Sequence, residues 1–202
     1  MRLEKTNYGG ITVGDYGQET FFQFFIRYCA PTMASLKCAN MMSCPNTETC
    51  RMDLREIQEE LKDKGIRVRV MYENDRRMLV LVYRPALLEK RMRSGEIRAF
   101  LEEYGYDDLD VEDALDRLQA RILSGAGSFP HEIGVFLGYP LEDIRGFIEN
   151  NGKNGLCCGE WKVYHEPEKA LKIFANLKKC RDIYLSLFSN GTRTLMQLTV
   201  AA

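Results

Sequence analysis

The chain has 202 residues and a mass of 23.3 kDa, which fits one domain of ordinary size. Hydrophobic residues make up 45% and charged residues 28%, and this balance argues against intrinsic disorder. Lys plus Arg (28) nearly equals Asp plus Glu (29), so no global positive field exists to hold nucleic acid or an anionic membrane. Met1–Gly10 lacks a secretory apolar segment, and every apolar run is far shorter than the roughly 20 residues of a membrane span. We therefore expect a cytoplasmic protein with no nucleic-acid and no membrane partner.

Seven cysteines are many for this length, and their number is odd. Because no secretion signal is visible, we expect reduced thiols rather than a disulfide framework. No Cys-x-x-Cys pair occurs, although zinc ribbons and thioredoxin-like redox sites both need one. The adjacent pair Cys157-Cys158 is the unusual feature of the cysteine pattern.

The first predicted element is a helix over Gln18–Cys29, where aromatic and apolar residues recur at helical spacing. Pro31 is expected to end it, because proline disfavours helical geometry in the residue before it. The apolar stretch 32–42 does not alternate cleanly, and its short length favours a strand near residues 32–38.

The next predicted elements are a solvated helix over 53–64 and an antiparallel hairpin over 66–83. Gly65 is a typical helix stop. Residues 66–72 alternate apolar with basic side chains, and residues 78–83 form a β-branched run after turn-forming residues.

The second half of the chain is predicted to be mainly helical, with one further strand. The expected helices cover 85–92, 96–104, 111–124, a short segment opened by Ser128, 140–149 and a long segment from Pro167 to Gly191, and the strand covers 160–165. Together these elements predict a single α+β domain over 1–202, with a small antiparallel sheet covered by helices. The link Gly125–Gly127 is a candidate subdomain boundary.

The motifs of the common enzyme classes are absent. The zinc arrangement H-E-x-x-H fails because residue 135 is valine, and no G-x-S-x-G, G-x-G-x-x-G or Walker sequence can be written. The sequence therefore offers no catalytic residue by motif.

Three segments carry a resemblance to a known family. They are the run HEIGVFLGYP (131–140) with EDIRGFIENNG after it, the segment CGEWKVY (158–164), and the earlier YCAPTMASLK (28–37) with Asn40. In these segments the chain is similar to a family of uncharacterised proteins of anaerobic bacteria, known only as a domain of unknown function. The resemblance covers most of the chain and implies no activity.

His131, in the first turn of a predicted helix, either binds a ligand or metal or hydrogen-bonds to a loop. Glu132 is more simply explained as a partner of the helix dipole than as a base. Cys157 and Cys158 suit a soft metal or thiol exchange, with two small buried turn residues as the alternative.

The other candidate ligand-binding residues lie in the remaining similar segments. Cys29 ends a predicted helix, and Lys37 and Lys162 each offer a positive charge to an anion or simply lie on the surface. Asn40 and Tyr164 complete the set because they belong to the first and last of these segments.

Two interpretations remain. In the first, a pocket of His, Cys and Lys side chains binds a small molecule or a transition metal such as iron or zinc, in a redox-related enzyme or a binding protein. In the second, the chain is a non-catalytic regulatory or protein-interaction module. The concentration of His, Glu, Lys, Trp and paired Cys within about 35 residues favours the first.

Overall fold

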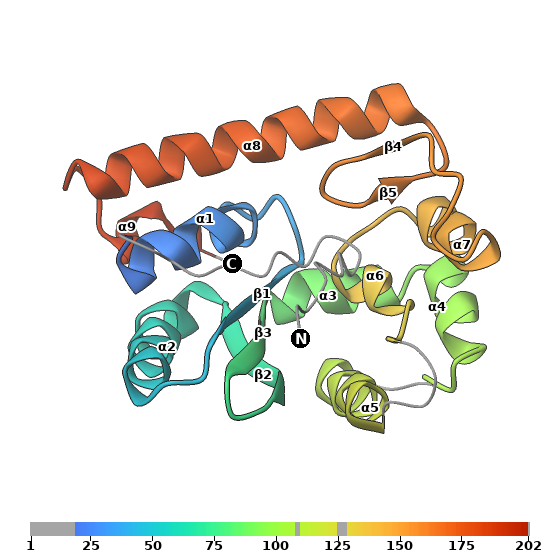
Figure 1. Cartoon of the computed structure of the whole chain (residues 1–202), viewed down its shortest axis with the longest axis horizontal. Coiled ribbons are helices and arrows are strands. Elements are labelled where there is room, and N and C mark those ends of the chain that lie inside the picture. The colour runs from blue at the N-terminus through green and yellow to red at the C-terminus, as the bar shows by residue number, and fades with distance from the viewer. Residues whose placement is uncertain (1–18, 108–109, 125–128, 202) are drawn as a thin grey trace, which may run out of the picture.

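A computed structural model describes residues 19–107, 110–124 and 129–201. The chain forms an α+β fold in which helices cover both faces of a small antiparallel sheet (Figure 1). The predicted fold class is therefore confirmed. The expected start of the first helix at Gln18, the cap Ser128 and the link Gly125–Gly127 lie outside the described residues.

The main sheet has the strand order β1-β3-β2, and both pairs are antiparallel. Strands β2 (Arg67–Glu73) and β3 (Arg77–Tyr83) form the predicted hairpin, which is confirmed. Its turn is held by Asn74, whose Oδ1 accepts the backbone amides of Arg76 and Arg77 at 3.0 Å each. The register shifts between Val70 and Tyr72, which marks a β-bulge.

The third strand and the first helix differ from the prediction. The helix α1 (Phe21–Met33) contains Pro31, and the strand expected near 32–38 is β1 (Ala39–Pro45) instead. Pro31 falls in the last turn of α1, where a missing amide costs at most one helical hydrogen bond. Strand β1 is buried on both faces and therefore shows no alternation in its sequence.

Alternate side chains of β3 enter two different hydrophobic cores. Met78, Val80 and Val82 enter the first core, whereas Leu81 and Tyr83 enter the second. This division explains why β3 is apolar almost throughout, since both of its faces pack against a core.

The first core is covered by helices from both ends of the chain: α1, α2 (Glu48–Leu61), the short η1 (Lys62–Lys64), the second half of α8 (Pro167–Ser189) and α9 (Leu195–Leu198). Helix α2 begins earlier than the predicted residue 53. The Thr47 hydroxyl caps it by accepting the Cys50 amide at 3.2 Å.

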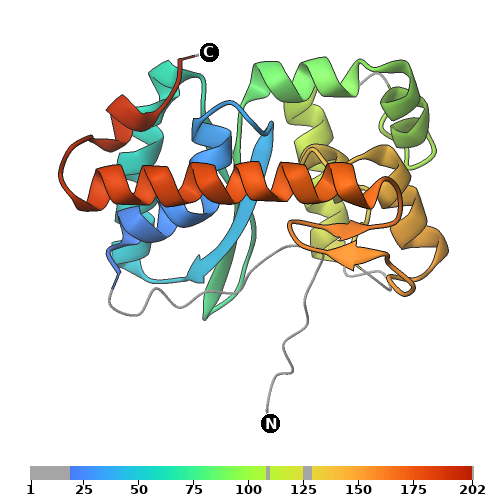
Figure 2. The ribbon, with the colours of Figure 1, turned by 90° about the horizontal axis from the view of Figure 1, so that it is seen from above.

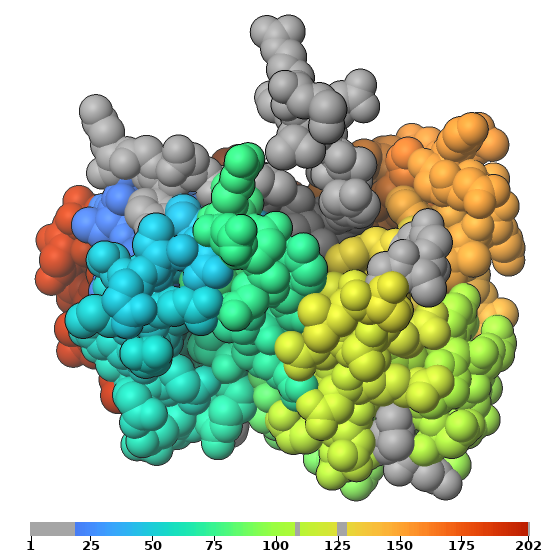
Figure 3. Space-filling view, turned by 60° about the horizontal axis from the view of Figure 1, so that its bottom comes forward, coloured from blue at the N-terminus to red at the C-terminus, as the bar shows by residue number. Residues whose placement is uncertain are grey.

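The second core is covered by the middle of the chain: α3 (Pro85–Met92), α4 (Gly95–Glu102), α5 (Val111–Ser124) and α6 (Ile133–Phe136). Arg69 on β2 contacts Glu112 and Asp116 of α5, so the basic face of the hairpin is partly covered by this helix rather than fully solvated. Figure 3 shows α2, the hairpin and α5 side by side on one surface of the molecule.

The last part of the second core consists of α7 (Leu141–Glu149) and a separate two-stranded sheet. Its strands, β4 (Cys157–Cys158) and β5 (Lys162–Val163), pair antiparallel, so the strand predicted over 160–165 is shorter and does not join the main sheet. Helix α8 then runs across both halves of the molecule (Figure 2). No helix within the described ranges has the length and apolarity needed to cross a bilayer.

A buried arginine joins three separate segments around the first core. The Arg84 guanidinium donates to the carbonyls of Thr32 (2.7 Å) and Met33 (2.8 Å) at the end of α1. It also donates to Lys64 at 3.0 Å and Val200 at 2.7 Å. Helix α1 has no basic residue in its last turn, so Arg84 supplies the positive charge that its carbonyl end favours.

Candidate functional site

Lys37 lies in the tight loop between α1 and β1. The Pro31 carbonyl accepts the amides of Leu36 (2.9 Å) and Lys37 (3.2 Å), and Ser35 takes a left-handed φ of 61°. The loop directs the Lys37 side chain to Tyr139, with Nζ 5.2 Å from the ring centroid. This is the geometry of a cation–π contact.

Tyr139 is held by neighbours on three sides. Its ring lies 5.2 Å from that of Trp161, which in turn makes an edge contact with Phe174 at 4.6 Å. Arg91 fixes the backbone by donating to the carbonyls of Val135 (2.8 Å) and Tyr139. Burial raises the pKa of the Tyr139 phenol, so the ring is neutral at physiological pH.

An ion pair between Glu160 and Arg181 lies beside Lys37. Arg181 binds both carboxylate oxygens of Glu160, one of them at 2.6 Å, and both side chains are about one-fifth exposed. Burial lowers the pKa of Lys37 to about 8; Glu160 opposes this shift and Arg181 adds to it. We call Lys37, Tyr139, Glu160 and Arg181 the Lys37 site.

Two thiols close to this site are buried. Burial raises the pKa of both Cys29 and Cys38, although nearby Lys37 acts in the opposite direction on each. The Cys38 Sγ donates to the Phe136 carbonyl at 3.3 Å. Cys29 and Lys37, both candidates from the sequence, therefore lie near each other, with Cys29 as a protonated thiol of the first core.

The lowered pKa of Lys37 has a consequence for stability. An unfolded lysine has a pKa of about 10.4, so between pH 8 and 10.4 the unfolded state binds more protons at Lys37 than the folded state, and the contribution of Lys37 to stability rises with pH. We expect the change in unfolding free energy between pH 7 and pH 10 to be more favourable in the wild type than in Lys37→Met by about 2–3 kcal/mol, measured by urea unfolding. Lys162→Met is the control and should follow the wild type. Equal pH slopes for wild type and Lys37→Met would contradict the burial of this amine.

Asn40 has a structural role near the same loop. Its Oδ1 accepts the Thr32 hydroxyl at 2.7 Å, and both residues are buried. This bond ties the start of β1 to the last turn of α1.

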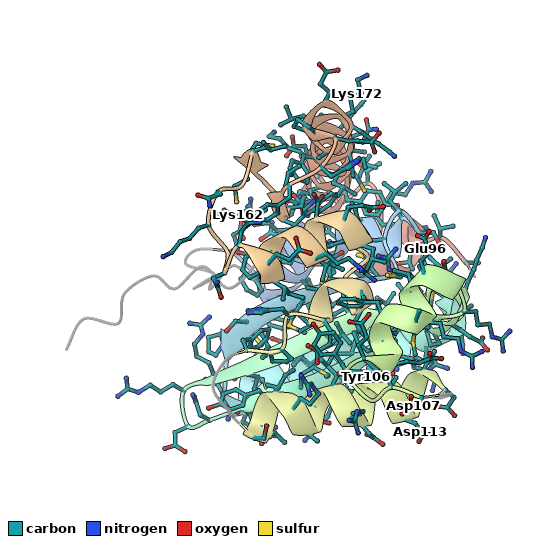
Figure 4. The ribbon with its side chains drawn as sticks, turned by 90° about the vertical axis from the view of Figure 1, so that its right-hand side faces the viewer. Glu96, Tyr106, Asp107, Asp113, Lys162 and Lys172 are labelled. Atoms are coloured by element: carbon teal, nitrogen blue, oxygen red, sulfur yellow. The ribbon has the colours of Figure 1, made fainter. Side chains whose placement is uncertain are left out.

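His131, Lys162 and Tyr164 gather instead around the loop that follows α7. The His131 ring makes an edge contact with Phe147 at 5.0 Å. Lys162 Nζ donates to the Gly152 carbonyl at 2.5 Å, and the Tyr164 hydroxyl donates to that of Lys153 at 2.8 Å. Figure 4 shows Lys162 on the β4–β5 hairpin, away from Tyr106 beside α5.

The Glu132 side chain is buried, and its carboxylate does not bind the first backbone amides of α6. One carboxylate oxygen accepts the Tyr106 hydroxyl at 3.1 Å and also binds Arg121. Its side chain makes no capping bond to α6, so its charge is met by Arg121 and not by the helix. The other oxygen, Oε2, has no hydrogen-bond partner among the described residues.

Asp143 is an organising residue that the sequence does not reveal. Its carboxylate accepts the Trp161 indole N–H at 2.6 Å and the amides of Tyr164 (2.7 Å) and His165 (2.9 Å). It is buried, so these three donors hold a charge that is almost removed from water. In sequence it reads as an ordinary acidic residue in a first helical turn.

The close approaches in the 131–164 region need small residues. A Cβ at Gly134 would lie 2.8 Å from Ile144 Cγ1, and one at Gly146 would lie 2.5 Å from Tyr164 Cβ. Tight packing explains these glycines without a ligand.

The metal candidates Cys157 and Cys158 pair with β5 and are free thiols, the second one exposed. Within residues 19–107, 110–124 and 129–201, no group of three or more His, Cys, Asp or Glu side chains is arranged to hold a metal ion.

Fold and site together define an α+β protein whose three-stranded sheet separates two helix-covered cores, with a half-buried lysine between elements of both. A family model described as "Protein of unknown function (DUF3793)" matches residues 25–199. The chain therefore belongs to this family, and the matched range includes the whole Lys37 site. Comparisons with curated proteins and with solved structures found no match.

Proposed function

We propose that the protein binds a small anionic ligand, a carboxylate or a phosphate, at the Lys37 site and does so in the cytoplasm. The observation that carries the proposal is the state of the Lys37 amine. No hydrogen-bond acceptor or carboxylate of the described residues contacts Nζ, although the side chain is largely removed from solvent.

The neighbours of the amine favour an anion as the missing partner. Glu160, the carboxylate with the largest electrostatic effect on Lys37, is already bound through both oxygens by Arg181. Nζ also lies over the Tyr139 ring and near two buried thiols, none of which is negatively charged at neutral pH. A bound anion would supply the negative charge that the ammonium of Lys37 needs as a partner.

Thermal unfolding with inorganic phosphate and with small mono- and dicarboxylates tests the proposal. A ligand at 100 times its Kd stabilises the folded state by about 2.7 kcal/mol, which raises the Tm of a chain of this size by roughly 5–10 °C. We expect such a shift for the wild type with at least one of these anions, and none with matched chloride.

Lys37→Met removes the charge but keeps an unbranched side chain, so it should fold and lose the shift. Lys162→Met, whose amine is bound to the Gly152 carbonyl, should keep it. Equal shifts in wild type and Lys37→Met, or no shift with any of the anions, would refute the proposal.

The second candidate function, a protein-interaction module, is favoured by one face of α8. Leu171 and Ile183 are 53% and 45% exposed, and a shallow groove along α8 is lined by both apolar and polar side chains: Ala175, Lys178, Lys179, Asp182, Ile183, Ser186 and Leu187. The metal-linked and redox alternatives stay predictions, which elemental analysis and absorbance of anaerobically purified protein would test.

A further inference from the structure

We propose that Lys37 forms a reversible imine with a small carbonyl compound that also carries a carboxylate or phosphate group. This inference rests on the proposed function, because the acidic group is what brings the compound to the site. The new element is the covalent step at Nζ.

The geometry leaves the amine available for this step. Among the described residues, Nζ donates to no acceptor, whereas Lys162 and Lys169 donate to a carbonyl and a carboxylate, respectively. The Lys37 side chain is also oriented, because two backbone amides of the loop donate hydrogen bonds to the Pro31 carbonyl and the amine lies over the Tyr139 ring. The residue as a whole is partly exposed.

The surroundings disfavour a permanently charged lysine. Burial of the side chain opposes protonation of Nζ and outweighs nearby Glu160, which favours it, while Arg181 adds a smaller effect in the same direction as burial. A pKa of about 8 leaves roughly a tenth of the amine uncharged at pH 7, a fraction about a hundredfold larger than for a lysine of ordinary pKa. Lysines desolvated by burial are activated as nucleophiles in this way.

The step balances without a redox partner. The lone pair of the uncharged Nζ attacks the carbonyl carbon, and the C–N bond forms as the C=O π bond breaks. Both amine protons then leave with the carbonyl oxygen as water, and a C=N bond remains. Hydrolysis reverses the reaction. Protonation of the imine nitrogen gives an iminium, which places a positive charge next to the former carbonyl carbon.

Reductive trapping tests the proposal with glyoxylate, which joins an aldehyde to a carboxylate. The full-length protein is incubated with glyoxylate and borohydride at pH 7, and the adduct is located by intact mass and peptide mapping. We expect one carboxymethyl group, mainly on Lys37, with labelling at least about tenfold faster than at Lys172. Acetaldehyde, which lacks the acidic group, should label Lys37 with much lower preference over surface lysines.

Lys37→Arg keeps the positive charge but cannot form an imine, so it should lose the adduct and retain the thermal shift with phosphate. Lys172→Arg is the matched surface control and should leave labelling of Lys37 unchanged. If Lys37→Arg fails to fold, competition of phosphate with glyoxylate labelling of the wild type replaces it. Labelling spread evenly over exposed lysines, together with a retained phosphate shift, would overturn the imine and leave the proposed function standing. Even labelling without any anion-induced shift would overturn both.

Discussion

Replacing Arg84 with methionine is expected to lower the free energy of unfolding by about 3–5 kcal/mol. The substitution removes the donor for four backbone carbonyls and leaves the two at the end of α1 without this donor in a buried setting. Burial of the guanidinium lowers the pKa of Arg84, which shows that burying this charge costs free energy. The substitution removes that cost. The expected loss is therefore smaller than the sum of four unsatisfied groups.

Urea unfolding followed by circular dichroism measures this loss as a shift in midpoint. Arg55→Met is the control, because the Arg55 side chain is 73% exposed and its ion pair among the described residues is a 3.8 Å contact with Glu48. It should change stability by less than about 0.5 kcal/mol. If the two variants lose the same stability, Arg84 does not organise the first core.

Asp143→Asn should lower the free energy of unfolding by about 2–4 kcal/mol although it barely changes side-chain volume. The carboxylate accepts three N–H groups, and an amide in its place must turn its own NH₂ group towards at least one of them. The bond to Trp161 gives a local readout, since this is the chain's only tryptophan. We expect its fluorescence to shift to longer wavelength as the β4–β5 hairpin loosens.

Glu142→Gln is the matched control for Asp143→Asn. Glu142 is the preceding residue in the first turn of α7 and is exposed, so its loss affects mainly the helix dipole. Its tryptophan spectrum should match that of the wild type. An unchanged spectrum in Asp143→Asn as well would show that Asp143 does not position Trp161.

The periodic parts of the fold could be predicted from the sequence. The hairpin over 66–83 has an alternating first strand and clear turn residues, and both are local signals. Helices α3 and α5 have the predicted bounds, because a proline starts the first and an acidic segment precedes the second.

The errors at the start of the chain have a tertiary cause. Pro31 was expected to end the first helix, yet α1 continues to Met33, where distant Arg84 binds its last carbonyls. That added turn displaces the strand from 32–38 to Ala39–Pro45. Arg84 lies 52 residues after Thr32 in the sequence, so the local pattern around Pro31 does not indicate this contact.

The candidate site could be predicted only in part, for the same reason. Lys37 is a candidate because it belongs to the segment 28–37 that resembles the family. The Glu160–Arg181 pair cannot be predicted in this way, because it joins the β4–β5 turn to α8 across 21 residues. Tyr139 directly follows Gly138, and the local sequence does not indicate that Lys37 packs on its ring. The structure gives the remaining candidates His131 and Lys162 other neighbours, Phe147 and Gly152.

The division of the sheet between two cores has a consequence for the order of folding. The second core draws its helices from one continuous stretch of chain, α3 to the start of α8, so the contacts among these helices close shorter loops than those that join the first core. The first core needs α9 beside α1 and α2, and Arg84 reaches Val200 across 116 residues. Contacts of such high sequence separation form late, so the N-terminal helices must wait for the far end of the chain before their own core can close.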